Sequence, residues 1–242
     1  MSAISKAVDA IEVVLQAGGP IRLTELAAEL GVAKSSAHRL VTALEEAHLL
    51  SRTDLGALTV GPRLLGWAAS TDASSRLRVV AEPLMRQLRD ETGETINLHV
   101  RRGTARICLI SMPGRFSLVP FFRIGEPIPL DRGAAGRALL AFAPQDVIDE
   151  VSHHFEAHGA APLPEELRRW REERWVVITD EIEPGLAAAA TVILPRTGEM
   201  AALALGGSSA RLDDARFREL RPLMLRCADE IAHRLAETDK PR

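Results

Sequence analysis

The sequence contains no tyrosine, only two cysteines, and aromatic residues amount to just 4% of the chain. Cys108 and Cys227 lie far apart and show no CxxC or Cys/His spacing, so neither a disulfide framework nor a zinc knuckle is expected. No apolar run approaches the ~18 residues of a membrane-spanning helix. The first residues, Met1 to Lys6, lack the apolar stretch of a signal peptide, and we therefore expect a cytoplasmic protein.

A strong excess of charge of either sign is also missing. The net charge of −3 excludes a chain-wide electrostatic affinity for nucleic acid. The first seventy residues carry six basic and seven acidic side chains, so any DNA-binding surface there requires the basic groups to be sorted onto one face. With 242 residues, of which 46% are hydrophobic, the chain is long enough for two globular domains.

The N-terminal region carries apolar residues at helical spacing. A first helix is predicted over Ala7 to Leu15, and Gly18-Gly19-Pro20 ends it. Thr24 is predicted to cap a second helix over Thr24 to Leu30, and a third helix is expected from Lys34 to Ala47.

Small residues mark the place where the second and third helices would cross. Ala27 and Ala37 have short side chains, and Gly31 between them tolerates the positive φ of a sharp turn. Because two helices need small residues to pack closely around a short turn, this spacing predicts a helix-turn-helix.

The outer face of the third helix carries short polar and basic side chains that suit base edges and phosphates in a major groove. These predicted DNA-binding residues are Lys34, Ser35, Ser36, His38, Arg39 and Thr42. A hairpin is expected over Leu49 to Arg52 and Ala57 to Val60, which would form a wing with Arg52 available to a phosphate. A three-helix bundle with a solvated polar face is the alternative interpretation.

The remaining chain changes from helical to alternating periodicity. We predict a DNA-binding domain over residues 1–61, a linker helix over 62–75 and a second domain over 76–242. In the second domain the expected helices and strands follow one another as helix 77–91, strands 96–100 and 106–112, extended 117–122, loop 125–129, helices 137–142, 144–157 and 165–173, strands 175–179, 188–194 and 200–205, and helix 213–236. This order predicts an α+β fold with a mainly antiparallel sheet.

The chain resembles the IclR family of bacterial transcription regulators nearly end to end. The resemblance rests on Leu23-Thr24-Glu25-Leu26-Ala27, Lys34-Ser35-Ser36-Ala37-His38-Arg39-Leu40, Glu91-Thr92-Gly93-Glu94-Thr95, Gly133-Ala134-Ala135-Gly136-Arg137-Ala138-Leu139 and Glu183-Pro184-Gly185, among other motifs. It implies a winged helix-turn-helix joined to a GAF-like effector domain, which assembles as a homodimer or homotetramer on double-stranded operator DNA. Most members of the family repress transcription, and many respond to small carboxylates or aromatic metabolites.

The resemblance also implies an effector pocket. Its expected lining is Gly133, Ala134, Ile178, Asp180, Ala188, Ala204 and Gly206. A helix N-terminus at Gly133 suits a carboxylate on physical grounds. Ala188, Ala204 and Gly206 replace polar residues that small oxo-acids use in the family, so a larger or more apolar acid is the expected effector. The alternative, in which these small residues only pack a tight core and no effector binds, stays open.

Signs of enzymatic chemistry are missing from the sequence. There is no GxSxG elbow, Walker loop or dinucleotide fingerprint, and Gly206-Gly207-Ser208-Ser209 is interpreted as a loop. His153, His154 and His158 are interpreted as a solvated helix face, so no metal and no cofactor is predicted. A ligand-independent DNA-binding or interaction module and a metabolic enzyme with an accessory helical domain remain as rival functions.

Overall fold

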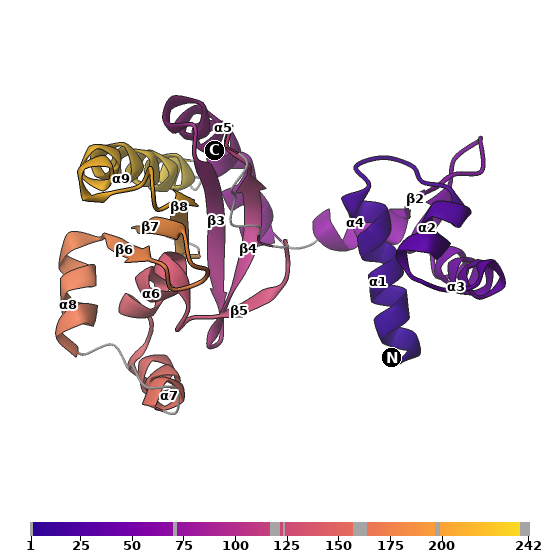
Figure 1. The fold of residues 1–242 in the computed structure, drawn as a ribbon, viewed down its shortest axis with the longest axis horizontal. Coiled ribbons are helices and arrows are strands. Elements are labelled where there is room, and N and C mark those ends of the chain that lie inside the picture. The colour runs from indigo at the N-terminus through magenta and orange to yellow at the C-terminus, as the bar shows by residue number, and fades with distance from the viewer. Residues whose placement is uncertain are drawn as a thin grey trace. The chain divides into compact units, whose positions relative to one another are not determined.

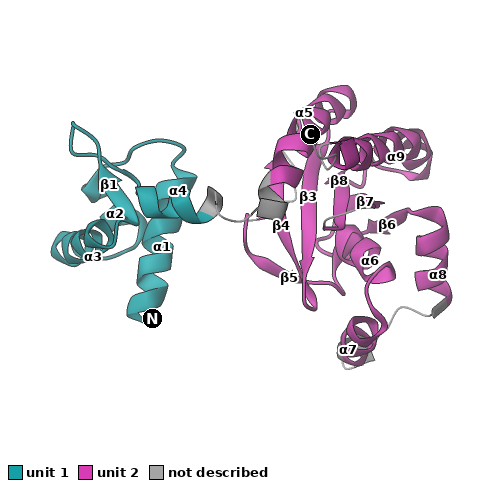
Figure 2. Cartoon of the chain, turned by 180° about the vertical axis from the view of Figure 1, so that it is seen from behind, with its two compact units in different colours: residues 1–75 teal, residues 76–242 magenta. Residues whose placement is uncertain are grey.

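The computed structural model describes residues 2–69, 72–116, 122, 124–156, 164–196 and 199–237. The chain divides into two compact units, Met1–Ser75 and Arg76–Arg242, here called the N-terminal and C-terminal units (Figure 2). Each unit has its own hydrophobic core. They are therefore described separately.

The N-terminal unit is a small helical domain with a hairpin (Figure 1). Its elements are α1 (Ala3–Gln16), α2 (Leu23–Glu29), α3 (Lys34–Glu46), β1 (Leu50–Arg52), β2 (Leu58–Val60) and α4 (Pro62–Ala69). Its core is formed by Ala10, Val14, Leu26, Val41, Leu44, Leu50 and Leu58. The predicted order of three helices and a hairpin is confirmed.

The crossing of α2 and α3 depends on the small residues that the sequence pattern singled out. Ala27 and Ala37 are buried, and Gly31 has a φ of +62°, which an L side chain adopts only with strain. The predicted cap at Thr24 is wrong. α2 begins at Leu23, and the Glu25 carboxylate accepts the Arg22 N–H at 2.8 Å, so the acidic side chain in the first turn takes the capping role.

The hairpin pairs β1 with β2 in antiparallel register, with Leu50 opposite Val60 and Arg52 opposite Leu58. The Thr53 N–H donates to the Ala57 carbonyl at 2.8 Å, which closes the turn. Leu50 and Leu58 are buried in the core, so one side of the wing is fixed to the helices.

The C-terminal unit is built on a six-stranded sheet in the order β5-β4-β3-β8-β7-β6, and all its paired strands are antiparallel. The elements are α5 (Asp72–Thr92, beginning in the N-terminal unit), β3 (Thr95–Arg102), β4 (Ala105–Met112), β5 (Pro127–Pro129), α6 (Gly133–Ala141), α7 (Gln145–Glu156), α8 (Pro164–Glu173), β6 (Val176–Thr179), β7 (Leu186–Ile193), β8 (Ala201–Ser208) and α9 (Asp214–Glu237). The predicted α+β class is confirmed.

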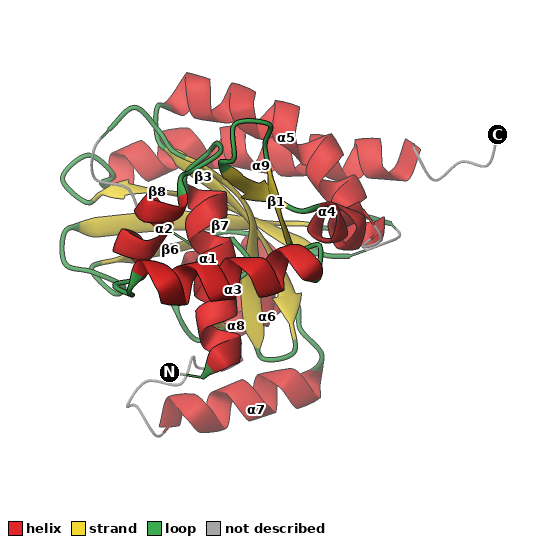
Figure 3. Ribbon diagram, turned by 90° about the vertical axis from the view of Figure 1, so that its right-hand side faces the viewer, coloured by secondary structure: helices red, strands yellow, loops and turns green. Residues whose placement is uncertain are grey.

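The two faces of this sheet belong to two separate cores. The long helices α5 and α9 lie side by side on one face, as Figures 1 and 3 show, and pack on Ile96, Leu98 and Val100 of β3. The short, apolar α6 covers the other face, together with residues of α7 and α8. Because side chains alternate along a strand, Asn97 and His99 of β3 point to the α6 side.

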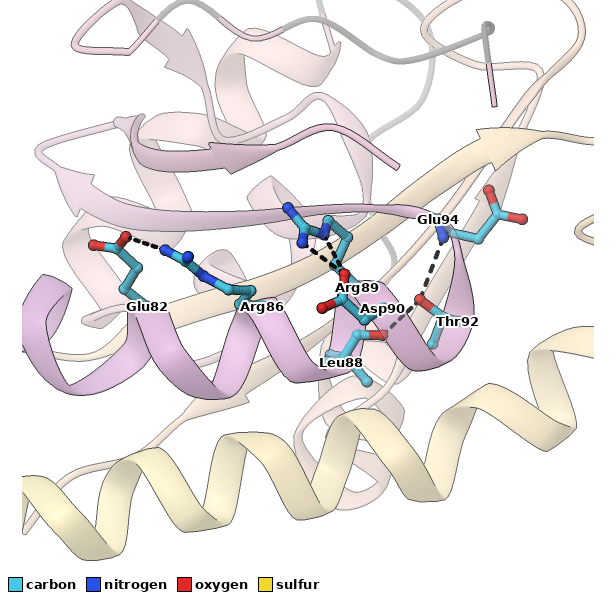
Figure 4. Close-up of polar contacts among 7 residues, drawn as sticks. All are labelled: Glu82, Arg86, Leu88, Arg89, Asp90, Thr92 and Glu94. Atoms are coloured by element: carbon cyan, nitrogen blue, oxygen red, sulfur yellow. Dashed lines mark hydrogen bonds and ion pairs between the residues drawn. The ribbon is translucent and has the colours of Figure 1, made fainter. Parts of the chain in front are cut away.

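The motif Glu91-Thr92-Gly93-Glu94-Thr95 at the end of α5 has a structural explanation (Figure 4). The Thr92 hydroxyl donates to the Leu88 carbonyl at 2.8 Å and accepts the Glu94 N–H at 3.3 Å. Gly93 ends the helix with a φ of +76°. The buried Glu94 carboxylate then forms an ion pair with Arg211 at 2.9 Å. The motif therefore fixes the entry of the chain into β3.

Two expectations for this unit are wrong. Residues 127–129 were expected in a loop, but they form the edge strand β5 on β4. Gly206, Gly207 and Ser208 were also expected in a loop, but they continue β8, because β7 pairs with all three. The helix N-terminus expected at Gly133 is confirmed, because α6 begins there. The extended segment expected over 117–122 lies outside the described residues, apart from Phe122.

A hydrogen-bonded pair of buried polar side chains interrupts the core under α6. His99 is fully buried and Arg106 is 1% exposed. The Arg106 Nη1 donates to His99 Nδ1 at 2.9 Å. Burial, with a smaller contribution from the Arg106 charge, holds the pKa of His99 well below its usual 6.5. His99 is therefore a neutral acceptor in the folded protein at neutral pH.

This lowered pKa predicts a dependence of stability on pH. Below about pH 6.5 the unfolded chain protonates His99 and the folded chain does not, so the free energy of unfolding falls with a slope approaching ~1.4 kcal/mol per pH unit. His99→Gln keeps an amide acceptor for Arg106 and removes the titrating group. Between about pH 6.5 and about pH 5.5, urea unfolding should show roughly 1 kcal/mol less loss of stability in this variant than in the wild type. An equal loss in both proteins would contradict a neutral, buried His99.

Candidate functional sites

The exposed face of α3 carries the residues expected to contact DNA. Ala37, Val41 and Leu44 are buried against the rest of the unit. The opposite face consists of exposed side chains, namely Lys34, Ser35, Ser36, His38, Arg39 and Thr42. The helix alone therefore brings six of the seven predicted residues together.

The leading end of α3 favours an anion. Ala33 precedes the helix and provides no side-chain cap, so the first N–H groups of α3 are not capped by that side chain. Within the described part of the chain, Arg39 makes no hydrogen bond or ion pair. Thr42 lies at the limit of hydrogen bonding to His38 Nδ1, at 3.5 Å. The basic and hydroxyl groups of this face are therefore largely available.

Arg52, the seventh residue, is already engaged. Its Nε lies 2.9 Å from Glu45 Oε1, and its Nη1 donates to the Gly56 carbonyl at 3.1 Å. The pair connects the end of α3 to the turn of the hairpin. Arg52 thus fixes the wing. Its contact with a DNA phosphate stays a prediction, and Arg52 would have to bind the phosphate beside Glu45 or in place of it.

In the C-terminal unit, one pocket gathers six of the seven expected effector residues. These are Gly133, Ala134, Ile178, Ala188, Ala204 and Gly206. The strand register explains the gathering, because Ala188 of β7 lies opposite Ile178 of β6 on one side and Gly206 of β8 on the other. The N-terminus of α6 lies across this row of small residues.

Asp180, the remaining expected residue, is placed elsewhere. It adopts a φ of +58°, and its Oδ1 accepts the Gly185 N–H at 2.7 Å. Its N–H donates to the Leu186 carbonyl at 2.8 Å. Asp180 therefore shapes the turn between β6 and β7 and is absent from the described lining of the pocket.

Sequence reasoning missed the polar side of the pocket, which consists of Asn97, His99 and Arg106 together with Phe122. The alternation of Ile96, Leu98 and Val100 could have indicated Asn97 and His99, because it places these two residues on the opposite face of the strand. Arg106 gave no such signal, because a lone arginine at the start of a strand is typical of a solvated position.

The electrostatics of the pocket are dominated by groups near the start of α6. The Gly133 N–H donates to Glu181 Oε1 at 3.1 Å, and Glu181 Oε2 lies 2.5 Å from Arg137 Nη2. The Arg106 guanidinium lies 5.0 Å from the centre of the Phe122 ring. Among the described residues, the buried Arg106 Nε and Asn97 Oδ1 have no hydrogen-bond partner.

The pocket is narrow as it stands. Its cavity is about 30 Å³, room for two or three water molecules at ~10–15 Å³ each. A second, more open cavity of about 460 Å³ shares Arg106, Phe122 and Ile182 with it. These three side chains therefore separate an inner from an outer space, and a ligand larger than a few atoms must displace Phe122 or Ile182.

Other groups with chemical potential have structural explanations. Burial raises the pKa of Cys108 to about 11 and that of Cys227 to about 12, so both are protonated thiols at neutral pH. His153 donates to the Asp149 carbonyl at 2.8 Å, and the side chains of His154 and His158 lie outside the described residues. The described residues contain no cluster of three potential metal ligands. Among them no helix is long and apolar enough to cross a bilayer.

Comparison with known proteins covers both units. The family profile described as the IclR helix-turn-helix domain matches residues 3–54, and that of the bacterial transcriptional regulator IclR C-terminal domain matches residues 70–233. The acetate operon repressor of Salmonella typhimurium is 25% identical, covering 96% of this chain and 89% of its own. The transcriptional regulator BhcR of Paracoccus denitrificans is 28% identical, covering 97% and 87%.

A solved structure shares the fold. An IclR homolog from Microbacterium hydrocarbonoxydans, crystallised with 4-hydroxybenzoate, matches with a TM-score of 0.69 at 22% identity, covering 98% of this chain and all of that one. The helix-turn-helix, the antiparallel sheet with its helices and the two matched profiles lead to one conclusion. This chain is a member of the IclR family of bacterial transcriptional regulators.

Proposed function

We propose that this regulator acts in the cytoplasm, places α3 in the major groove of a double-stranded operator and is controlled by a small apolar acid bound under α6. The observation that carries the DNA-binding part is the sorting of side chains on α3. Its exposed face presents the free cation Arg39 with His38 and short hydroxyls, in a unit whose net charge is close to zero. Binding then depends on this face rather than on bulk charge.

An apolar stripe on α1 supports assembly with a second copy of the chain. Ile4 is 77% exposed, Val8 48% and Leu15 54%, and their spacing of four and seven residues puts them on one side of the helix. A symmetric dimer would cover this stripe and place two α3 helices on half-sites about one helical turn, ~34 Å, or a multiple of it apart. We propose a homodimer as the minimal DNA-binding form, with a homotetramer as a further assembly.

The pocket lining favours an apolar body with one acidic group. Ala188, Ala204 and Gly206 leave no side-chain hydroxyl or thiol on the strands for a two- or three-carbon oxo-acid. The related Microbacterium hydrocarbonoxydans protein crystallised with 4-hydroxybenzoate, an aromatic acid, which supports the same class here. The curated relative named as a repressor supports repression as the sign of regulation.

Control requires the effector to bind two arrangements of the DNA-binding units with different affinity. α4 ends at Ala69 and α5 begins at Asp72, so this short connection is where the C-terminal unit would act on the N-terminal one. The narrow inner cavity favours the rival function, a DNA-binding module without an effector. The acid titration below separates the two functions.

The first prediction concerns Arg39. Arg39→Ala should weaken binding to the operator by ~1–3 kcal/mol and relax the base preference at one position in each half-site. Arg216→Ala, which removes the same charge from the exposed face of α9, is the matched control and should bind as the wild type does. Selection of bound DNA from a random pool, followed by fluorescence anisotropy, measures both effects. An unchanged footprint and affinity in Arg39→Ala would remove this residue from the set that reads bases.

The second prediction concerns the stripe on α1. Val8→Glu places a charge in the proposed dimer contact and should weaken binding to a two-half-site operator roughly 10- to 100-fold, because the second half-site is lost as an intramolecular partner. Binding to an isolated half-site should not change. Val8→Leu keeps the stripe apolar and serves as the control. Equal losses on both kinds of DNA would show that α1 acts on folding or on DNA directly.

The third prediction concerns the effector. Isothermal titration should show that benzoate or cyclohexanecarboxylate binds roughly tenfold or more tightly than glyoxylate or pyruvate, because the larger acids bury more apolar surface in the pocket. Ala188→Leu fills the pocket and should abolish this binding while leaving operator binding intact. Tighter binding of the oxo-acids would refute the proposed effector class, and DNA binding unaltered by any acid would favour the ligand-independent module.

A further inference from the structure

Arg106 is a buried cation without a counter-ion in the described structure. Only 1% of the residue is exposed, and no acidic side chain among the described residues forms an ion pair with it. Burial lowers the pKa of Arg106 to about 10, so the side chain keeps its charge at neutral pH. A charge taken out of water costs several kcal/mol unless a partner compensates it.

The groups that contact Arg106 are neutral. His99 accepts one hydrogen bond from Nη1, and the Phe122 ring faces the guanidinium at 5.0 Å. His99 is itself in edge-to-face contact with Phe122, with ring centres 5.2 Å apart. These contacts hold the guanidinium in place but leave its charge uncompensated and its Nε without a partner.

The surroundings of Arg106 add positive potential. A Cβ added to Gly133 would lie 3.3 Å from Arg106 Nη2, so the guanidinium reaches the N-terminus of α6 and its partial positive charge. Glu181, which lines the outer cavity with Arg106, is paired with Arg137 and accepts the Gly133 N–H. Arg132 and Glu126 also line the outer cavity, so three guanidinium groups and a helix N-terminus are balanced by two carboxylates.

We propose that Arg106 binds the carboxylate of the effector, with Nε and Nη2 directed at the acid, and thereby makes the pocket selective for anions. This assignment rests on the proposed function, because it presumes that the pocket under α6 takes a ligand. It moves the acid-binding group from the Gly133 N–H, which already donates to Glu181, to a side chain on β4. The apolar body of the acid then lies along Ala188, Ala204 and Gly206.

The test compares benzoate with benzamide, which has the same shape and no charge. Wild-type protein should bind benzoate at least about tenfold more tightly than benzamide, as expected for a charge-assisted pair in a desolvated site. Arg106→Gln keeps a donor for His99 and loses the charge, so the ratio of the two dissociation constants should fall to near one. Isothermal titration of full-length protein gives both constants.

One further variant and one further measurement separate the role of Arg106 from that of its neighbours. Arg132→Gln makes the same change on the wall of the outer cavity and should leave the ratio unchanged. Arg106→Gln should also unfold at a temperature equal to or above that of the wild type, because it removes an uncompensated buried charge. A structural arginine would instead show a lower unfolding temperature.

Three results would overturn the assignment. They are an undiminished preference for benzoate in Arg106→Gln, a preference lost in Arg132→Gln, or no saturable binding of benzoate to the wild type at millimolar concentration. Operator binding is measured on the same preparations without any acid. Its failure would refute the proposed regulation of DNA binding, whereas the benzoate-to-benzamide ratio would still decide the role of Arg106.

Discussion

The close contact between α6 and the sheet is the constraint on which the C-terminal unit depends. A side chain at Gly136 would overlap the Leu130 carbonyl, so the helix reaches the chain before it only because this position has no Cβ. The strands that face α6 also carry small residues, namely Ala188, Ala204 and Gly206. With small residues on both sides, the helix N-terminus comes within reach of β3 and β4, and the pocket lies at that junction.

The same pocket contains a buried cation for which the described residues provide no counter-ion. Dense packing around α6 favours apolar side chains, yet Arg106 and His99 occupy positions that leucine or methionine would fill at lower cost. Arg106 is a charged residue in a well-packed core, and its Nε has no partner among the described residues. Such a residue is expected where binding a ligand, rather than stabilising the fold, determines which side chain is present. The physical conflict between core packing and an isolated cation therefore supports the proposed effector site more strongly than the shape of the cavity does.

Periodicity predicted the helices, the hairpin and the α+β class, because these elements bury one regular face. It failed where long-range pairing decided the outcome. Gly206 and Gly207 have turn-forming residue types, but pairing keeps them extended: Gly206 pairs with both β3 and β7, and Gly207 with β7. Asp180 was expected in the pocket and instead stabilises a turn. The strand that carries Arg106 was predicted, but the burial of its side chain was not, because an arginine at the start of a strand is typical of a solvated position.

The strand β3 connects the pocket to the rest of the C-terminal unit. Asn97 and His99 face α6 and line the pocket, while Ile96, Leu98 and Val100 on the same strand pack on α5. The inner cavity is too small for an aromatic ring, so a ligand must shift side chains against a densely packed sheet that transmits strain. α5 begins three residues after α4 ends, so under the proposed function a displacement of β3 would reach the helix that leads to the N-terminal unit. Ligand binding and DNA binding are then coupled to the extent that opening the pocket favours one position of α5.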